Sequence, residues 1–364
     1  MLKIEPVDTL FFRDGKPFSM GDQSAAFGIF PPYPSTVYGA IRTGVISQSK
    51  GYSSFCAGDM AAEIGTPEDT TSASFGLKGI FLWKDECLYL PAPLDLVTED
   101  EKDEKKAFRT LKKESPPFLS NIDLPSYLFF RESEKAQSVA GSFISDTDLK
   151  DYLNGSRNEF NLYQQNYFSQ VEHKTGIKRG IKTRTVEEGD LYRVGMMRLR
   201  KDCALVCDIE GVPSLSNRGV LKLGGEGKVV RYETVSLSLP DECEAIIEQI
   251  NQTKQFKLFL ATPALFEDGW LPDDKILNNS DYQLELLTAA TGNPFHVGGW
   301  EMAKKKNGRR AGGHKPMMRA IPSGSVYCFK IKSGKVETIY NQLHYQNIGK
   351  RAKEGFGLAF VGVM

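Results

Sequence analysis

A chain of 364 residues can bury a large core, and its length favours two domains over one. Charged residues make up 25% and hydrophobic residues 40% of the chain, as in ordinary globular proteins, and the formal net charge is zero. The composition therefore excludes a protein that attracts polyanions over its whole surface. It also excludes a disulfide scaffold, because six cysteines are too few for this length.

The predicted elements of the first half are few, and the acidic stretch Glu99 to Glu104 precedes the last of them. Alternation of apolar and polar residues predicts strands, Gly and Pro clusters predict loops, and a polar residue ahead of an apolar stripe predicts a helix start. In chain order we expect a strand over 2–12, a long loop over 21–34, a helix from the N-cap Ser35 through Gln48, a hairpin over 75–90 that turns at Asp85-Glu86, and a helix near 105–113.

The second half repeats this pattern of many strands and few helices. Such a pattern in two halves predicts the α+β class. The domain boundary is placed in the polar stretch between Ser145 and Lys182, which divides the chain into 1–165 and 166–364. The predicted elements are strands near 194–209, 218–235, 256–262 and 325–332, helices at 240–252 and near 282–290, and a last strand after a Gly-rich turn.

Charge is unevenly distributed along the chain. Residues 85–104 contain eight acidic residues and one lysine, whereas residues 300–364 contain thirteen Lys or Arg and three acidic residues. A neutral protein with one basic end neutralises phosphates with that end. The sequence therefore predicts a local polyanion site in the C-terminal part of the chain.

Six stretches carry a resemblance to a known family. The first, EPVDTLFFRDGKPFSMGDQSAAFGIFPPYPSTVYGAIRTG, resembles the opening of third subunits of the type III-B CRISPR effector, the Cmr complex. The others follow in the expected order and span nearly the whole chain, and the last resembles the Gly-rich loop of the wider repeat-associated mysterious protein (RAMP) family. They are GIKRGIKTRTVEEGDLYRVGMMRL, LGGEGKVVRYE, LATPALFEDGWLP, GGWEMAKKKNGRRAGGHKPMMRAIPSGSVYCF and GFGLAFVG.

The resemblance implies a fold of two ferredoxin-like, RRM-like RAMP domains with long insertions, the second ending in the Gly-rich loop. It implies a non-catalytic, cytoplasmic subunit that helps to hold the 5′ handle of the CRISPR RNA in antiviral defence. The implied protein partners are the large polymerase-like subunit and the backbone RAMP subunit. No cofactor, metal or membrane contact is implied.

The strongest local signal is the basic segment KKKNGRRAGGHKPMMR. Cations neutralise phosphates, and interleaved glycines let the backbone approach them closely. The alternative interpretation is a solvated basic loop. The candidate RNA-binding residues of this segment are Lys304, Lys305, Lys306, Arg309, Arg310, His314, Lys315 and Arg319.

A second basic segment, HKTGIKRGIKTR, has the pattern of a β-hairpin that presents cations. Its candidates are Lys174, Lys178, Arg179, Lys182 and Arg184. The alternative is a hairpin that packs on a neighbouring subunit.

Three further candidates lie in the aromatic-rich N-terminal block, and five lie around the terminal GFG turn, which resembles a backbone cradle for a phosphate. The alternative for the turn is a tight bend before the last strand. These candidates are Arg13, Lys16 and Arg42, and Lys350, Arg351, Lys353, Gly355 and Gly357.

Two other functions remain open. One is a metal-independent endoribonuclease of the same superfamily, in which His314 or His173 acts as a general base. The other is a protein-interaction scaffold without RNA contact, with the acidic stretch 85–104 facing a basic partner. The sequence contains no metalloprotease HExxH motif and no nucleotide-binding GxGxxG motif after a strand. The segment LGGEGKV is not a Walker loop, because it lacks the first Gly and the Ser or Thr of that motif.

Overall fold

The structure, a computed structural model, describes most of the chain. The described residues are 1–13, 25–67, 69–98, 109–114, 124–129, 136–179, 186–239, 243–301, 305–306, 309–310 and 312–364.

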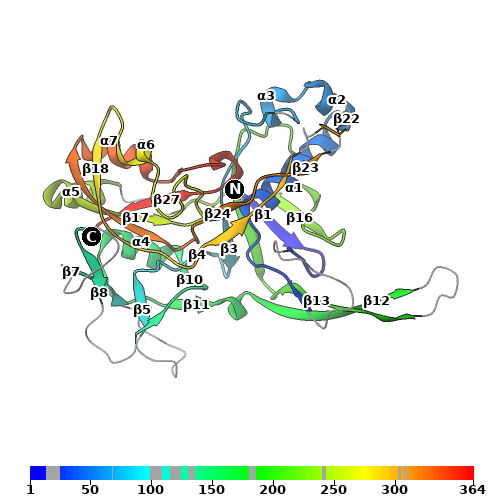
Figure 1. Cartoon of the computed structure of the whole chain (residues 1–364), viewed down its shortest axis with the longest axis horizontal. Coiled ribbons are helices and arrows are strands. Elements are labelled where there is room, and N and C mark those ends of the chain that lie inside the picture. The colour runs from blue at the N-terminus through cyan, green and yellow to red at the C-terminus, as the bar shows by residue number, and fades with distance from the viewer. Residues whose placement is uncertain are drawn as a thin grey trace.

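Two antiparallel sheets form the body of the protein (Figure 1). A mixed helix and strand fold built on antiparallel sheets agrees with the predicted class. Within the described residues, the larger sheet has eight strands. In spatial order they are β11 (Leu162–Gln164), β10 (Ser142–Ser145), β4 (Cys87–Pro91), β3 (Gly76–Lys84), β14 (Cys203–Glu210), β1 (Leu2–Pro6), β16 (Val229–Thr234) and β15 (Arg218–Lys222).

The smaller sheet is formed by the C-terminal part of the chain. Its described strands, in spatial order, are β18 (Gln283–Ala290), β25 (Val326–Ser333), β17 (Gln255–Leu260), β27 (Leu358–Gly362) and β26 (Gln346–Asn347). Two helices that contact each other, α5 (Cys243–Thr253) and α7 (Val336–Leu343), lie beside this sheet in Figure 1.

The predicted boundary at 165/166 does not coincide with the division between these sheets. Strands β10 and β11 of the larger sheet precede it, and β14, β15 and β16 of the same sheet follow it. The division into two domains at that position stays a prediction.

The hairpin predicted at Asp85-Glu86 is confirmed. Strands β3 and β4 pair antiparallel on either side of these two residues, with Leu82 opposite Tyr89. Both turn residues have positive φ, 50° at Asp85 and 64° at Glu86. Two successive positive φ angles match the right-handed twist of paired strands, which is why two-residue hairpins adopt them.

The first long helix, α1, runs over Pro34–Gln48, but its N-cap is Tyr33 and not the predicted Ser35. Proline fixes φ near the helical value and has no N–H to satisfy, so it is favoured at the first helical position. Pro34 therefore moves the helix start one residue before the polar residue that suggested it.

Two predicted helices are wrong. Of the helix predicted near 105–113, residues 105–108 lie outside the described residues, and residues 109–110 and 112–114 form strands β6 (Arg109–Thr110) and β7 (Lys112–Glu114). Residues 283–290 form strand β18. The segment QLELLTAA suits either structure locally. Pairing with β25 decides the outcome, because it satisfies the backbone hydrogen bonds of β18 within the sheet.

Two β-ribbons leave the sheets. The long ribbon consists of β12 (Ser169–Arg179) and β13 (Val186–Leu199), and it extends well beyond the body in Figure 1. The short ribbon is formed by the chain segment that connects β18 to β25, and it is built from three successive strand pairs. These are β19 (Phe295–Val297) with β24 (Met318–Ala320), β20 (Trp300–Glu301) with β23 (Gly313–His314), and β21 (Lys305–Lys306) with β22 (Arg309–Arg310).

Smaller elements connect these parts. The helices are α2 (Gly51–Ala57), α3 (Ala61–Ile64), α4 (Asp146–Asn154) and α6 (Asp274–Leu277), with 3₁₀ turns η1 (Gln165–Tyr167) and η2 (Ala352–Glu354). The remaining strands are β2 (Ala25–Phe27), β5 (Leu96–Thr98), β8 (Tyr127–Phe129) and β9 (Gln137–Ser138).

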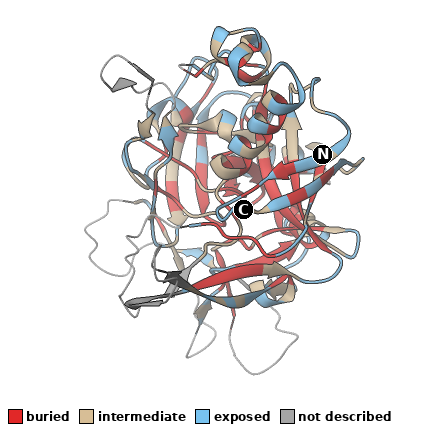
Figure 2. Ribbon diagram, turned by 90° about the vertical axis from the view of Figure 1, so that its right-hand side faces the viewer, coloured by how far each residue is buried: buried red, intermediate tan, exposed pale blue. Residues whose placement is uncertain are grey.

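One hydrophobic core joins the two sheets. It combines Phe81 and Leu90 of the larger sheet with Phe259 and Phe360 of the smaller sheet, all at most 2% exposed. Buried residues accordingly run through the strands, while the helices carry exposed residues on their outer faces (Figure 2). Since the apolar area of both sheets is removed from water together, the sheets hold each other in a fixed arrangement.

Candidate nucleic-acid interface

The long ribbon carries one group of predicted cations. Lys174 lies in β12, near the body, and its side chain is described. Lys178 and Arg179 lie further along β12, where only the backbone is described. Lys182 and Arg184 lie outside the described residues. The predicted hairpin therefore exists, and it carries Lys174 to a specific contact at its base.

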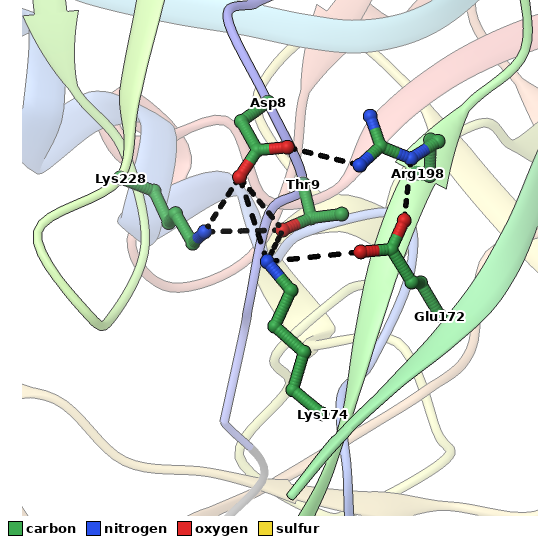
Figure 3. Close-up of polar contacts among 6 residues, drawn as sticks. All are labelled: Asp8, Thr9, Glu172, Lys174, Arg198 and Lys228. Carbon is green, nitrogen blue, oxygen red and sulfur yellow. Dashed lines mark hydrogen bonds and ion pairs between the residues drawn. The ribbon is translucent and has the colours of Figure 1, made fainter. Parts of the chain in front are cut away.

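That contact is an ion-pair cluster around Asp8, the residue that follows β1 by two positions (Figure 3). Its carboxylate oxygens lie 2.9 Å from Arg198, 3.2 Å from Lys228 and 3.5 Å from Lys174. Arg198 also donates to Glu172 across 2.6 Å. The base of the ribbon is thus tied to the start of the chain and to the turn between β15 and β16.

Thr9 lies beneath this cluster and is fully buried. Its hydroxyl oxygen accepts hydrogen bonds from Lys228 at 3.0 Å and from Lys174 at 3.1 Å. The backbone N–H of Thr9, together with Lys228 and Arg198, holds the pKa of the Asp8 carboxyl well below its usual range. Asp8 is therefore ionised at neutral pH and stays available to all three cations.

The short ribbon carries the strongest sequence signal. Lys305, Lys306, Arg309 and Arg310 form its outermost described strand pair, in which Lys305 lies opposite Arg310; the side chains are not described, and Lys304 lies outside the described residues. Closer to the body, His314 and Arg319 are exposed. The predicted basic segment therefore forms backbone strand pairs where the structure describes it, and both RNA contact and the alternative of a solvated segment stay predictions.

A second ion-pair cluster anchors the short ribbon to η2. Glu354 accepts from Lys315 at 3.0 Å and from Arg351 at 2.5 Å. Arg351 also donates to the carbonyl oxygen of Gly298 at 2.9 Å, beside the ribbon. Burial raises the pKa of Glu354, but the two cations outweigh burial and hold that pKa below its ordinary value. Lys315 and Arg351 thus position the ribbon.

Two other predicted cations bind backbone oxygens of the protein. The half-buried Arg42 donates to Ile64 at 2.9 Å and to Thr66 at 2.7 Å. Lys353 donates to the carbonyl oxygen of Ala73. These contacts hold the loops after α3 in place.

The remaining predicted cations are nearer to solvent. Lys350 forms an ion pair with Glu267 at 3.1 Å, and both side chains are more than 40% exposed. Arg13 is exposed, and Lys16 lies outside the described residues. Exposed pairs are weak in water, so the Lys350 ammonium can exchange its partner for a phosphate.

The terminal Gly355-Phe356-Gly357 segment forms a tight turn. Both glycines have positive φ, 92° and 74°. Their N–H groups donate to the carbonyl oxygens of Ala352 and Pro263. Two amides that a phosphate cradle would use therefore already have protein acceptors, and RNA contact by these glycines stays a prediction.

A cavity of about 480 Å³ is lined by residues of β3, β4 and β10, by the segment 29–34, and by the loops that follow β17 and precede β25. Tyr33 and Phe295 stack beside it, with ring centroids 5.3 Å apart. Its described lining contains no charged side chain. The described lining therefore offers a phosphate group no cation.

The described histidines and potential metal ligands do not gather at one place. No group of three His, Cys, Asp or Glu residues there has the arrangement of a metal site. His314 and His173 lie on different ribbons, and His344 accepts a backbone hydrogen bond from Val361. Among the described helices, none has the length and apolarity needed to cross a membrane. The acidic stretch 85–104 includes Asp95, which is 3% exposed.

The sequence did not point to Asp8, Arg198, Lys228 or Trp300 as interface residues. Asp8 and Lys228 are 220 positions apart, so no local pattern relates them. Trp300 had a usable signal, because it follows two glycines and precedes the basic run.

The fold and the two cationic ribbons define a class of protein: an antiparallel two-sheet α+β protein with basic projecting ribbons. Solved structures share this fold. One chain of the type III-B Cmr-beta complex bound to cognate target RNA and AMPPnP (state 1) has TM-score 0.51 and 17% identity, covering 93% of this chain and 87% of that chain. A chain of Cmr-beta bound to cognate target RNA has TM-score 0.50 and 18% identity, covering 90% and 86%.

The sequence gives the family. The profile described as CRISPR-associated protein (Cas_Cmr3) matches residues 2–364. The chain therefore belongs to the Cas_Cmr3 family of CRISPR-associated proteins, and the resemblance found from its motifs is confirmed. No curated protein matches the sequence.

Proposed function

We propose that this protein is the non-catalytic RNA-binding subunit of a type III-B CRISPR effector complex, where it helps to hold the 5′ handle of the CRISPR RNA in antiviral defence. The observation that carries the proposal is that two anchored β-ribbons present the basic segments of a protein with no net charge. Such local basic surfaces bind the phosphates of a nucleic acid without attracting polyanions elsewhere.

The anchoring clusters support this function. At each ribbon base, acidic residues hold cations in fixed positions: Asp8 for the long ribbon and Glu354 for the short one. A ribbon whose base is fixed loses less conformational entropy when its outer part binds. Binding of phosphates by the outer cations therefore costs less conformational entropy.

We also propose the two ferredoxin-like domains. Four strands of the smaller sheet lie side by side in the spatial order β18, β25, β17, β27. If these four are numbered along the chain from β17 to β27, that order is 2-3-1-4, which is the strand order of a βαββαβ unit. In the larger sheet β1, β3, β14 and β16 have the same relative order. The remaining strands and both ribbons are then insertions.

The proposed partners are the large polymerase-like subunit and the backbone RAMP subunit, in the cytoplasm. The two similar solved chains belong to Cmr-beta complexes that are bound to cognate target RNA. The proposal of a non-catalytic role rests on the scattered histidines and on the absence of a metal-ligand group among the described residues.

The test is binding of the full chain to a labelled single-stranded CRISPR RNA handle over a range of salt concentrations. The variant replaces the five cations Lys304, Lys305, Lys306, Arg309 and Arg310 with Ala. We expect weaker binding, and a shallower salt slope by about 0.7 for each phosphate that the variant no longer neutralises. A gel of the bound RNA detects cleavage.

The matched control removes five exposed lysines from other surfaces, so that both variants change net charge equally. It replaces Lys50, Lys201, Lys222, Lys275 and Lys335 with Ala. If RNA binding weakened equally in the two variants, the loss would come from the change in net charge and not from the basic segment. Absence of binding at every salt concentration would leave a scaffold, and cut RNA would establish a nuclease.

A further inference from the structure

The short ribbon carries an exposed aromatic ring among its cations. Trp300 on β20 is 57% exposed, whereas the other two tryptophans, Trp83 and Trp270, are half-buried. An indole left in water keeps a large apolar surface that a partner can cover. The ring lies on a ribbon whose sequence is rich in Lys and Arg.

The ring is held in place by its neighbours. Trp300 lies opposite His314 in the β20–β23 pair, and the two rings meet edge to face with centroids 5.3 Å apart. The indole also lies close to Gly312, which has a φ of 65°, and a Cβ at that position would overlap the indole nitrogen. The glycine thus makes room for the indole, and these contacts fix a surface that stays open to solvent.

The sequence of the short ribbon is strongly basic. Residues 295–320 contain seven Lys or Arg and a single acid, Glu301. Arg319 is exposed on β24, and Lys315 is fixed at the ribbon base by Glu354. A protein partner that buried the ring here would also have to neutralise these cations. A nucleic acid satisfies both requirements, because each nucleotide carries an aromatic base and a phosphate.

We propose that Trp300 is a stacking platform for one unpaired base of single-stranded RNA, while the cations of the same ribbon bind the neighbouring phosphates. This inference rests on the proposed function and names the form of RNA that the site accepts. In an A-form duplex the bases are stacked inside the helix, so the ring distinguishes single-stranded from double-stranded RNA. Stacking does not depend on base identity, since every base has a π face.

The test uses the full chain with Trp300→Ala, Trp300→Phe and, as a control, Tyr52→Ala. Tyr52 is a 59% exposed ring on α2, so its removal deletes a similarly exposed aromatic from another surface. For a single-stranded handle RNA we expect Trp300→Ala to weaken binding about 5- to 150-fold. The salt slope should stay unchanged, because no charge is removed.

Fluorescence tests the stacking itself. The wild-type protein should lose tryptophan emission on binding RNA, whereas Trp300→Phe should retain most of the affinity and lose the quenching. Replacing the handle bases with abasic sites should abolish both the quenching and the effect of Trp300→Ala. Thermal unfolding of each variant establishes that the fold is intact.

The two proposals fail differently. If the basic-segment variant loses RNA binding while Trp300→Ala binds normally, the stacking platform is overturned and the RNA-binding function stands. If Trp300→Ala only reduces co-purification with the large polymerase-like subunit, the ring belongs to a protein contact and the proposal is also overturned. If the wild-type chain binds no RNA, both proposals fail.

Discussion

The hydroxyl of Tyr152 on α4 donates a hydrogen bond to Asp95 across 2.7 Å inside the core that joins the two sheets. The ammonium of Lys257, from β17 of the smaller sheet, lies 3.3 Å from the centroid of the same tyrosine ring. Burial raises the pKa of Asp95 and lowers that of Lys257, so both groups are pushed toward their neutral forms. This polar contact links the chain after β4 to the smaller sheet.

Tyr152→Phe tests how much that contact contributes. The substitution keeps the ring and removes the donor, which leaves a buried carboxyl oxygen without its partner. We expect the free energy of unfolding to fall by about 1–3 kcal/mol, measured by urea denaturation. Tyr52→Phe, at an exposed position, is the control. Equal stability of Tyr152→Phe and wild type would show that water replaces the missing donor.

Asp8→Asn tests the anchor of the long ribbon. The variant keeps the size of the side chain but removes the charge that meets Arg198, Lys228 and Lys174. We expect faster amide hydrogen exchange at the base of β12 and β13, with little change in melting temperature, because exposed ion pairs contribute little to global stability. Asp59→Asn, an exposed acid after α2, should leave the ribbon amides unchanged.

Gly357→Ala tests the tight turn before β27. A Cβ at this position would overlap the carbonyl oxygen of Ile348, and the φ of 74° is unfavourable for alanine. We expect a loss of more than about 2 kcal/mol of stability. Gly227→Ala isolates the backbone contribution, since φ there is 64° and the space around it is open; it should cost about 1 kcal/mol. Similar destabilisation in the two variants would exclude the overlap as the cause.

Glu354→Gln tests the anchor of the short ribbon and has a defined pH dependence. The pKa of Glu354 is lower in the folded than in the unfolded protein. Its ionisation therefore stabilises the fold fully above the unfolded pKa, and this contribution is lost as pH falls through the folded pKa. The difference in melting temperature between wild type and Glu354→Gln should be largest near pH 7 and shrink toward pH 3. A difference independent of pH would contradict this role.

Elements with strong local signals could be predicted from the sequence. The Asp85-Glu86 hairpin follows from two strand-like runs around a two-residue turn. Helix α1 follows from its apolar stripe, although its first residue is Pro34 and not a residue after the predicted N-cap Ser35. Strand β18 could not be predicted, because QLELLTAA fits either structure until β25 supplies a partner. Secondary structure of such ambiguous segments depends on contacts far along the chain.

The candidate site was likewise predictable from the sequence only in part. The sequence indicated both basic segments and their glycines, since charge and composition are local properties. It did not indicate that Arg42 and Lys353 bind backbone carbonyl oxygens of the protein. Those oxygens lie 22 residues from Arg42 at Ile64 and 280 residues from Lys353 at Ala73, and no periodicity relates such positions.

The sequence by itself determined the family, the α+β class and the two basic segments. Motifs, strand-like runs and local charge depend only on residues that are close together in the sequence. Only the tertiary structure decided which cations form ion pairs at the ribbon bases and which bind backbone carbonyl oxygens. Lys315 and Arg351 meet at Glu354, and Lys174 meets Lys228 at Asp8, because folding brings distant segments within a few ångströms. At that separation ion pairs and hydrogen bonds form, and they determine which partner each charged side chain binds.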